Sequence, residues 1–135
     1  MKTIGIKIIP EAGRLAILPK KFGGQFLNFE MAVYDIAGRS PDYNGGYWDY
    51  MIAENGAFYM RPDSDSKFRF DNVAAYYEGV LSPDAFGVVC TLYACSLLAF
   101  DATGSDQGKL VDNFHLLRQV AVEHLEASDI LTAID

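Results

Sequence analysis

The segment SPDYNGGYWDYMIAENGAFYMRP, residues 40–62, decides how this chain folds. Residues 46–54 and 57–61 are rich in the aromatic and apolar side chains that favour β-strands. Asn55-Gly56 separates the two runs, and this dipeptide tolerates the two positive φ angles of a type I′ turn. The segment therefore predicts a β-hairpin with strands over Gly46–Glu54 and Ala57–Arg61.

The loop that leads into the hairpin holds candidate contact residues. Its Asp and Asn side chains can bond their own backbone, and the glycines at 45 and 46 can take conformations barred to other residues. Because alternate strand residues face opposite ways, we expect Trp48 and Tyr50 in the core and Tyr47 at the surface. Exposed aromatic side chains suit a protein contact surface. We predict a partner-binding surface made of Asp42, Tyr43, Asn44 and Tyr47. The alternative, in which Tyr43 and Asn44 only shape the turn, fits the sequence equally well.

Hydrophobic spacing predicts the other elements. Residues 22–37 show helical spacing up to Gly38. Ser82 as N-cap and Pro83 at the first helical position predict a core helix through the uncharged run 85–100. The remaining segments are two strands over 68–72 and 74–80, a polar loop over 101–108, an amphipathic helix over 109–125 with Leu110, Phe114, Leu117, Ala121 and Leu125 on its apolar stripe, and a last short helix.

These elements define the predicted fold class, which is α+β. We expect a small antiparallel β-meander of three to four strands, packed with about four helices on one face. A chain of 135 residues, half of them hydrophobic, is long enough for one ordinary core. We therefore predict a single domain spanning residues 1–135.

The uncharged run 85–100 also has to be tested as a membrane span. A span needs about 20 apolar residues, and this run is shorter and is flanked by Asp84 and Asp101. Residues 3–10 form only a brief apolar alternation broken by Lys7, unlike a signal peptide. We expect a core helix and a cytoplasmic protein.

The formal net charge of −7 is unevenly distributed along the chain. The first 21 residues carry +4, which leaves −11 for the remainder. An acidic body disfavours contact with DNA phosphates, so no direct DNA binding is expected. The closest group of carboxylates, Asp63, Asp65 and Asp71, is too sparse to copy a phosphate backbone and is better explained as solvated loop charges.

Side chains suited to catalysis or metal binding are few and scattered. Cys90 and Cys95 lie five residues apart in the predicted core helix, too far apart for a disulfide and wrongly spaced for one metal. His115 and His124 lie nine apart on one predicted helix and would project from opposite faces. Glu30 could act as a general base only with an acid partner, which the sequence does not offer. We predict a non-enzymatic protein without metal or cofactor.

Several of these segments together carry a family resemblance. They are Phe-Gly at 22–23, Asp-Tyr-x-Gly-Gly-x-Trp at 42–48, Asn-Gly-x-Phe-Tyr-Met-x-Pro at 55–62, Ser-x-Asp-Ala-x-Gly at 82–87 and Thr-Leu at 91–92. In this combination the chain resembles the ArdB/KlcA antirestriction family, from about Leu18 to its end. Ala57 departs from the family pattern, in which a second glycine is expected, and this affects the turn more than the function.

The resemblance implies a protein of plasmids and other mobile elements that relieves type I restriction and so protects incoming unmodified DNA. The implied partner is a type I restriction endonuclease complex or a factor controlling it, contacted directly or indirectly, with no membrane involved. The alternative from another class is an acidic DNA mimic or nucleic-acid-linked inhibitor module. Competition with DNA for the endonuclease would identify a mimic, and a salt-sensitive complex with DNA would identify a nucleic-acid-linked module.

Overall fold

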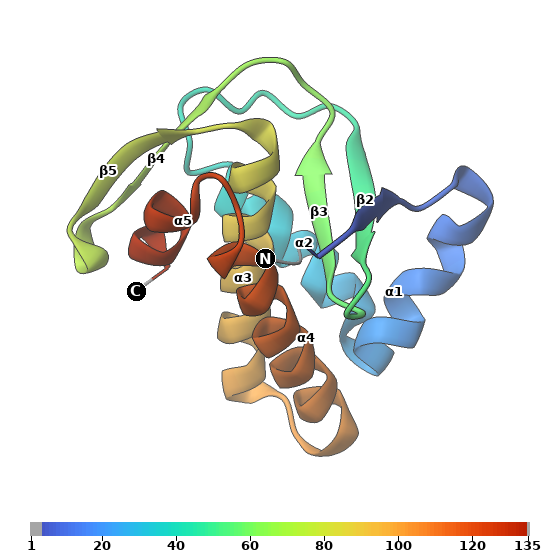
Figure 1. Cartoon of the computed structure of the whole chain (residues 1–135). Coiled ribbons are helices and arrows are strands. Elements are labelled where there is room, and N and C mark those ends of the chain that lie inside the picture. The colour runs from blue at the N-terminus through green and yellow to red at the C-terminus, as the bar shows by residue number, and fades with distance from the viewer. Residues whose placement is uncertain (1–3, 135) are drawn as a thin grey trace.

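The predicted hairpin forms two of the three strands of an antiparallel sheet (Figure 1). The structure is a computed structural model that describes residues 4–134. Strands β2 (Trp48–Ala53) and β3 (Phe58–Pro62) pair along their length. A short strand that the sequence pattern does not predict, β1 (Ile6–Ile8), pairs with the other side of β2. The strand order is therefore β1-β2-β3.

The turn between β2 and β3 differs from the predicted type I′ turn. The Ala53 N–H donates to the Ala57 carbonyl at 2.8 Å, and the Gly56 N–H donates to the Ala53 carbonyl at 2.9 Å. Gly56 has a φ of 92°, but Asn55 does not take the positive φ that a type I′ turn needs. The Asn55 side chain is held elsewhere, because its Nδ2 donates to the Leu116 carbonyl at 2.9 Å. The hairpin is confirmed, and its loop has three residues closed by a glycine of positive φ.

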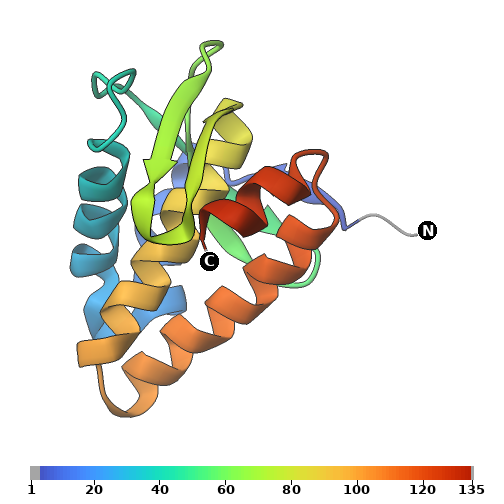
Figure 2. The ribbon, with the colours of Figure 1, turned by 90° about the vertical axis from the view of Figure 1, so that its left-hand side faces the viewer.

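The strands after the hairpin form a second sheet instead of continuing a meander. Strand β4 (Phe68–Asn72) lies where it is predicted, whereas β5 (Tyr77–Leu81) begins later than residue 74. A 3₁₀ turn over Val73–Ala75 and the left-handed Tyr76, with a φ of 55°, reverse the chain between them. In the described part of the chain β4 and β5 pair only with each other. Figure 2 shows this pair beside α5 (Ala127–Ala133).

Five α-helices in residues 4–134 accompany the two sheets, so the α+β class is confirmed. The helix predicted over 22–37 is shorter, because Gly23 takes a φ of 56° and separates α1 (Arg14–Phe22) from α2 (Phe26–Ala37). The sequence pattern does not predict α1. Pro19 lies inside it, and a proline normally disrupts a helix interior.

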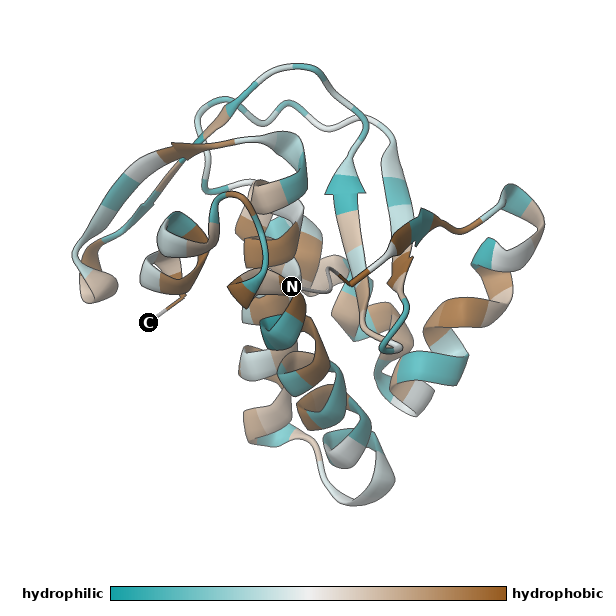
Figure 3. Cartoon of the chain, viewed as in Figure 1, coloured by the Kyte–Doolittle hydropathy of each residue, from teal (hydrophilic) through white to brown (hydrophobic). Residues whose placement is uncertain are grey.

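The core helix α3 (Pro83–Asp101) is confirmed together with its cap. The Ser82 Oγ accepts a hydrogen bond from the Ala85 N–H at 3.2 Å. By length and composition α3 could cross a membrane, but 56% of its apolar window is buried inside the protein. Figure 3 shows its hydrophobic residues at the centre of the molecule. We therefore assign it as the central helix of the core.

Helix α4 (Gly104–Val122) begins earlier and ends earlier than the predicted helix over 109–125. Residues 104–108 are helical instead of forming a loop, and the first turn is fastened by Asp106, whose Oδ1 accepts the Gly24 N–H at 3.2 Å. Leu125 therefore lies beyond the helix and is fully exposed. The rest of the predicted stripe is buried or partly buried, namely Leu110, Phe114, Leu117 and Ala121.

The hydrophobic core covers both faces of β3, so the prediction of helices on one face is wrong for this strand. Phe58, Tyr59 and Met60 are all fully buried although alternate residues face opposite sides. On one side the rings of Phe22 and Phe29 stack with centroids 4.0 Å apart, and both meet Phe58 edge-on. On the other side the Tyr59 hydroxyl reaches the first turn of α3.

The outer edge of β3 is closed by side chains from α3 and α4. Every second residue of an antiparallel strand directs its N–H and C=O away from the paired strand, and here these residues are Phe58, Met60 and Pro62. The Phe58 N–H donates to Asn113 Oδ1 at 2.8 Å, and Asn113 Nδ2 donates back to the Phe58 carbonyl at 3.0 Å. The Met60 N–H donates to Thr91 Oγ1 at 3.1 Å. Pro62 has no N–H, so no outward donor of this strand is left unpaired.

Gly87 allows α3 to lie against that edge. A Cβ at Gly87 would stand 2.2 Å from the Met60 carbonyl oxygen and 2.6 Å from Cα of Arg61. Gly87 and Thr91 are four residues apart and share a helix face. The close approach at Gly87 therefore brings the Thr91 hydroxyl within reach of the Met60 N–H.

Removing the Thr91 hydroxyl should destabilise the protein. Thr91→Val keeps the side-chain shape but leaves the buried Met60 N–H unpaired, which should lower the free energy of unfolding by about 1–3 kcal/mol. Thr132→Val is the matched control, since its hydroxyl donates to the Ser128 carbonyl on an exposed helix face, and its effect should be below about 0.5 kcal/mol. Urea denaturation of both variants checks the prediction, and equal effects would contradict it.

Candidate functional site

The predicted contact loop, residues 41–47, joins α2 to β2 and is fixed at several points. The Asp42 N–H donates to Ser40 Oγ at 3.3 Å, and Asp42 Oδ2 accepts the Arg69 N–H at 2.8 Å. Gly45 and Gly46 both have positive φ, 87° and 107°, and no neighbouring atom limits them. These glycines are therefore required by backbone conformation, while Asp42 fastens the loop to the start of β4.

Tyr43 points inward and supports the loop from beneath. Its hydroxyl accepts the Trp48 Nε1–H at 3.0 Å, and its ring meets the Trp48 ring edge-on with centroids 5.7 Å apart. It also packs against Phe68. Trp48 is 2% exposed, as the strand pattern predicts. Tyr43 is therefore only partly exposed, and its ring packs against the core beside Trp48, so its part in a contact surface stays a prediction.

Tyr47 and Asn44 face outward. Tyr47 is 50% exposed, its hydroxyl donates to Glu11 Oε2 at 3.1 Å, and the Arg14 guanidinium lies 4.8 Å above its ring. Asp42, Asn44 and Tyr47 share a hollow of about 230 Å³ with the segment after β3. The remaining lining residues are Gly45, Pro62, Asp63, Ser64, Ser66 and Phe68.

This hollow is suited to recognition by hydrogen bonding. Its rim offers the carboxylates of Asp42 and Asp63, the Asn44 amide and two serine hydroxyls, all of which accept hydrogen bonds. Three of the four predicted site residues therefore line one surface, and the fourth holds that surface in place. Arg14 and Glu11 also position Tyr47, and the sequence pattern gives no signal for either of them.

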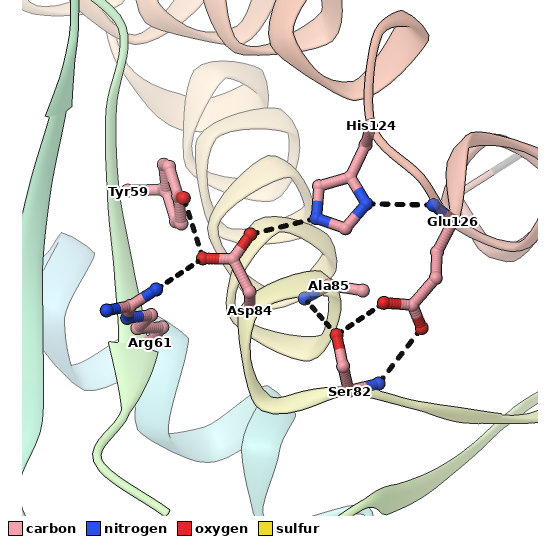
Figure 4. Close-up of polar contacts among 7 residues, drawn as sticks. All are labelled: Tyr59, Arg61, Ser82, Asp84, Ala85, His124 and Glu126. Carbon is pink, nitrogen blue, oxygen red and sulfur yellow. Dashed lines mark hydrogen bonds and ion pairs between the residues drawn. The ribbon is translucent and has the colours of Figure 1, made fainter. Parts of the chain in front are cut away.

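A second cluster of polar side chains centres on Asp84 in the first turn of α3 (Figure 4). Asp84 Oδ1 accepts the Tyr59 hydroxyl at 2.8 Å and Arg61 Nη1 at 2.9 Å. Asp84 Oδ2 lies 2.8 Å from His124 Nε2. Burial alone would raise the pKa of Asp84, but the hydrogen bonds from His124, Tyr59 and Arg61 outweigh it and hold this pKa below its ordinary value. Burial, reinforced by Asp84, raises the pKa of Tyr59.

His124 connects Asp84 to the turn between α4 and α5. Its Nδ1 accepts a hydrogen bond from the Glu126 N–H at 2.9 Å, so the ring hydrogen is on Nε2. The Nε2–H group donates a hydrogen bond to Asp84 Oδ2. The Glu126 carboxylate in turn accepts the Ser82 N–H at 3.0 Å and the Ser82 hydroxyl. The prediction that His124 lies on the same helix as His115 is wrong, because α4 ends at Val122. The fold brings Asp84 to His124 across 40 residues, a partner that the sequence does not identify.

This cluster is not arranged for nucleophilic catalysis. Both nitrogens of His124 are occupied, by Asp84 and by a backbone N–H, so neither is free to take a proton from a substrate. The Ser82 hydroxyl is bonded to Glu126 and to the Ala85 N–H instead of to His124. The arrangement ties the hairpin, α3 and the α4–α5 turn together.

Of the other candidate chemical groups, Glu30 is occupied and the cysteines are buried, whereas His115 is exposed on α4 beside Phe114. Glu30 accepts hydrogen bonds from the hydroxyls of Tyr34 at 3.3 Å and Tyr50 at 3.2 Å. Burial and the Glu30 charge raise the pKa of Tyr50 to about 12. Cys90 and Cys95 are free and buried, as predicted, and burial raises the pKa of both thiols, that of Cys95 to about 12. Within residues 4–134 no three His, Cys, Asp or Glu side chains converge as metal ligands would.

Comparison with known proteins gives consistent matches. A family model described as antirestriction protein matches residues 41–135. Two proteins named antirestriction protein KlcA from Escherichia coli are 39% and 38% identical over 94% and 99% of this chain, covering 90% and 96% of their own lengths. A solved structure has a TM-score of 0.88 at 36% identity and covers 99% of this chain and 96% of its own. It is reported for the KlcA and ArdB proteins, with antirestriction activity against type I DNA restriction systems in vivo but not in vitro.

Acid should weaken the protein through Asp84. Because the pKa of Asp84 is lowered in the folded state, its ionised form stabilises the fold above the ordinary carboxyl pKa, and this contribution is lost as pH falls below about 4. Asp84→Asn should therefore be less stable than the parent at pH 7 and should lose less stability between pH 4 and pH 2. Asp35→Asn, at an exposed site on α2, is the control. Urea denaturation at each pH measures the effect, and parallel pH profiles for parent and Asp84→Asn would contradict it.

Proposed function

This chain belongs to the antirestriction protein family, and we propose that it relieves type I restriction of incoming unmodified DNA by non-enzymatic contact with a protein in the cytoplasm. The observation that carries the proposal is the match of nearly the whole chain to the KlcA and ArdB structure, at 36% identity and a TM-score of 0.88. The family match over residues 41–135 includes the loop, the hairpin and α3.

The occupied chemical groups support a contact mechanism over an enzymatic one. Catalysis needs a nucleophile or base that can reach a substrate. The structure instead has His124 with both nitrogens bonded, Glu30 shared by two phenols, and buried cysteines with raised pKa values. His115 is exposed, but it is a lone imidazole on the surface of α4. The polar hollow beside residues 42–47 offers recognition without such a group.

The activity reported for the KlcA and ArdB proteins favours one kind of partner. Those proteins act against type I systems in vivo but not in vitro. That contrast is expected if the effect requires a cellular component that is missing from a purified reaction. We therefore favour a factor that controls the endonuclease complex as the partner, with the complex itself as the other candidate.

Expression of this chain should raise the plating efficiency of unmodified phage on a host with an active type I system. The same phage, modified beforehand, should plate equally with and without the protein, since it needs no protection. Soluble expression is verified by fractionation. Unchanged restriction of unmodified phage at verified soluble expression would contradict the proposed function.

The hollow can be tested separately from the fold. Asn44→Ala combined with Tyr47→Ala removes two outward side chains and should weaken restriction relief while leaving the melting temperature within a few degrees of the parent. Val73→Ala, at a side chain 87% exposed in the turn between β4 and β5, is the control that should change neither. Asp42 and Tyr43 are left intact, because their bonds to Arg69 and Trp48 support the loop. Full relief by the folded double variant would place the contact surface elsewhere.

A further inference from the structure

The two outer edges of the three-stranded sheet differ in the hydrogen-bond partners of their backbone groups. The β3 edge is closed by Asn113 and Thr91. At the opposite edge the hydrogen-bond pattern fixes which residues of the N-terminal strand face β2. The Glu54 N–H donates to the Gly5 carbonyl at 2.8 Å, and the Ile9 N–H donates to the Tyr50 carbonyl at 2.8 Å. Since the ladder alternates, residues 5, 7 and 9 point toward β2 and residues 4, 6 and 8 point away from it.

On the outer side of β1 a short stretch of backbone has no hydrogen-bond partner within residues 4–134. The Ile4 N–H donates to Glu123 Oε1 at 3.1 Å, and the next outward position after Ile8 is Pro10, which has no N–H. Between them, no acceptor from residues 4–134 meets the N–H of Ile6 or Ile8. Their side chains, 37% and 52% exposed, lie on the same side of the strand. Between Ile4 and Pro10 the edge thus offers two backbone N–H donors, two carbonyl acceptors and two apolar side chains.

We infer that this open edge of β1 is a strand-addition site that binds an extended segment of a partner protein. Main-chain groups of Ile6 and Ile8 would bond the added strand, as in other cases of strand addition to a sheet edge. Lys7 occupies the position between them, where side chains of paired strands stand closest. The segment that fits therefore carries a carboxylate opposite Lys7 and apolar side chains opposite Ile6 and Ile8.

Lys7 also argues against a second copy of this chain as the occupant. Two β1 strands paired antiparallel about a two-fold axis through Lys7 would set Lys7 directly opposite its own copy. Like charges in that position are destabilising. A foreign acidic strand replaces this repulsion with attraction.

The inference rests on the proposed function in one respect, namely that the partner contacted in restriction relief supplies the strand. Its first test is independent of restriction. We would add the peptide acetyl-Thr-Val-Glu-Val-Thr-amide at millimolar concentration to the full ¹⁵N-labelled chain and follow amide hydrogen exchange by NMR. Exchange at Ile6 and Ile8 should slow several-fold, whereas the Lys7 amide, already bonded to Ile52, should not change.

Two matched variants define the mode of binding. Ile8→Pro removes an outward N–H that the fold does not use, so it should keep the fold and abolish the effect of the peptide, whereas Ile8→Thr should retain it. Lys7→Glu provides a second variant that leaves the backbone unchanged. It should reverse the preference, so that a peptide with Lys in place of Glu binds better.

The outcomes separate this inference from the proposed function. The inference is overturned if the peptide leaves exchange at Ile6 and Ile8 unchanged, or if it has an equal effect on Ile8→Pro. It is also overturned if the slowing depends only on the protein concentration, as binding of a second copy would give. In cells, full restriction relief by Ile8→Pro alongside full relief by the parent would also overturn it. Absence of relief by the parent would contradict the proposed function, while peptide-dependent protection of Ile6 and Ile8 would still support the edge site.

Discussion

The hydrogen bonds that close the outer edge of β3 are the constraint on which the rest of this structure depends. That strand is buried on both faces, so its outward N–H groups cannot be satisfied by water and need partners within the protein. Asn113 supplies one partner and Thr91 the other. Thr91 reaches the strand because α3 approaches it as closely as Gly87 allows, and Asn113 reaches it from α4. The positions of α3 and α4 thus follow from the need to satisfy two buried donors.

The joint between α3 and the sheet accounts for part of the family resemblance. Ser82 caps α3, Asp84 gathers Tyr59, Arg61 and His124, Gly87 permits the close approach, and Thr91 accepts the edge N–H. The segment Ser-x-Asp-Ala-x-Gly and the following Thr-Leu are therefore accounted for by the joint between helix and sheet. The two surfaces that we propose for partner contact lie elsewhere, in the hollow beside Tyr47 and at the outer edge of β1.

The sequence predicts the elements that depend on local chemistry and misses those that depend on distant contacts. The hairpin and the cap of α3 follow from short-range patterns, since strand alternation and a Ser-Pro start act within a few residues. The turn geometry is mispredicted because Asn55 bonds to α4, 61 residues away. The partner of His124 lies 40 residues before it in the chain. Tyr43 is an exception, because its partner Trp48 is only five residues away, yet the strand alternation says nothing about the direction of a loop side chain. The sequence therefore predicts the loop that carries the candidate residues, whereas the direction of each side chain follows only from the fold.

Native-state hydrogen exchange of the Phe58 and Met60 amides tests this account most directly. If the β3 edge is closed as described, both amides should exchange only through global unfolding, with exchange free energies equal to the free energy of unfolding measured by urea. The Ile6 and Ile8 amides at the open edge should exchange far faster in the same experiment. Exchange of Phe58 and Met60 at the rates of Ile6 and Ile8 would show that α3 and α4 do not close this edge, and would contradict the account.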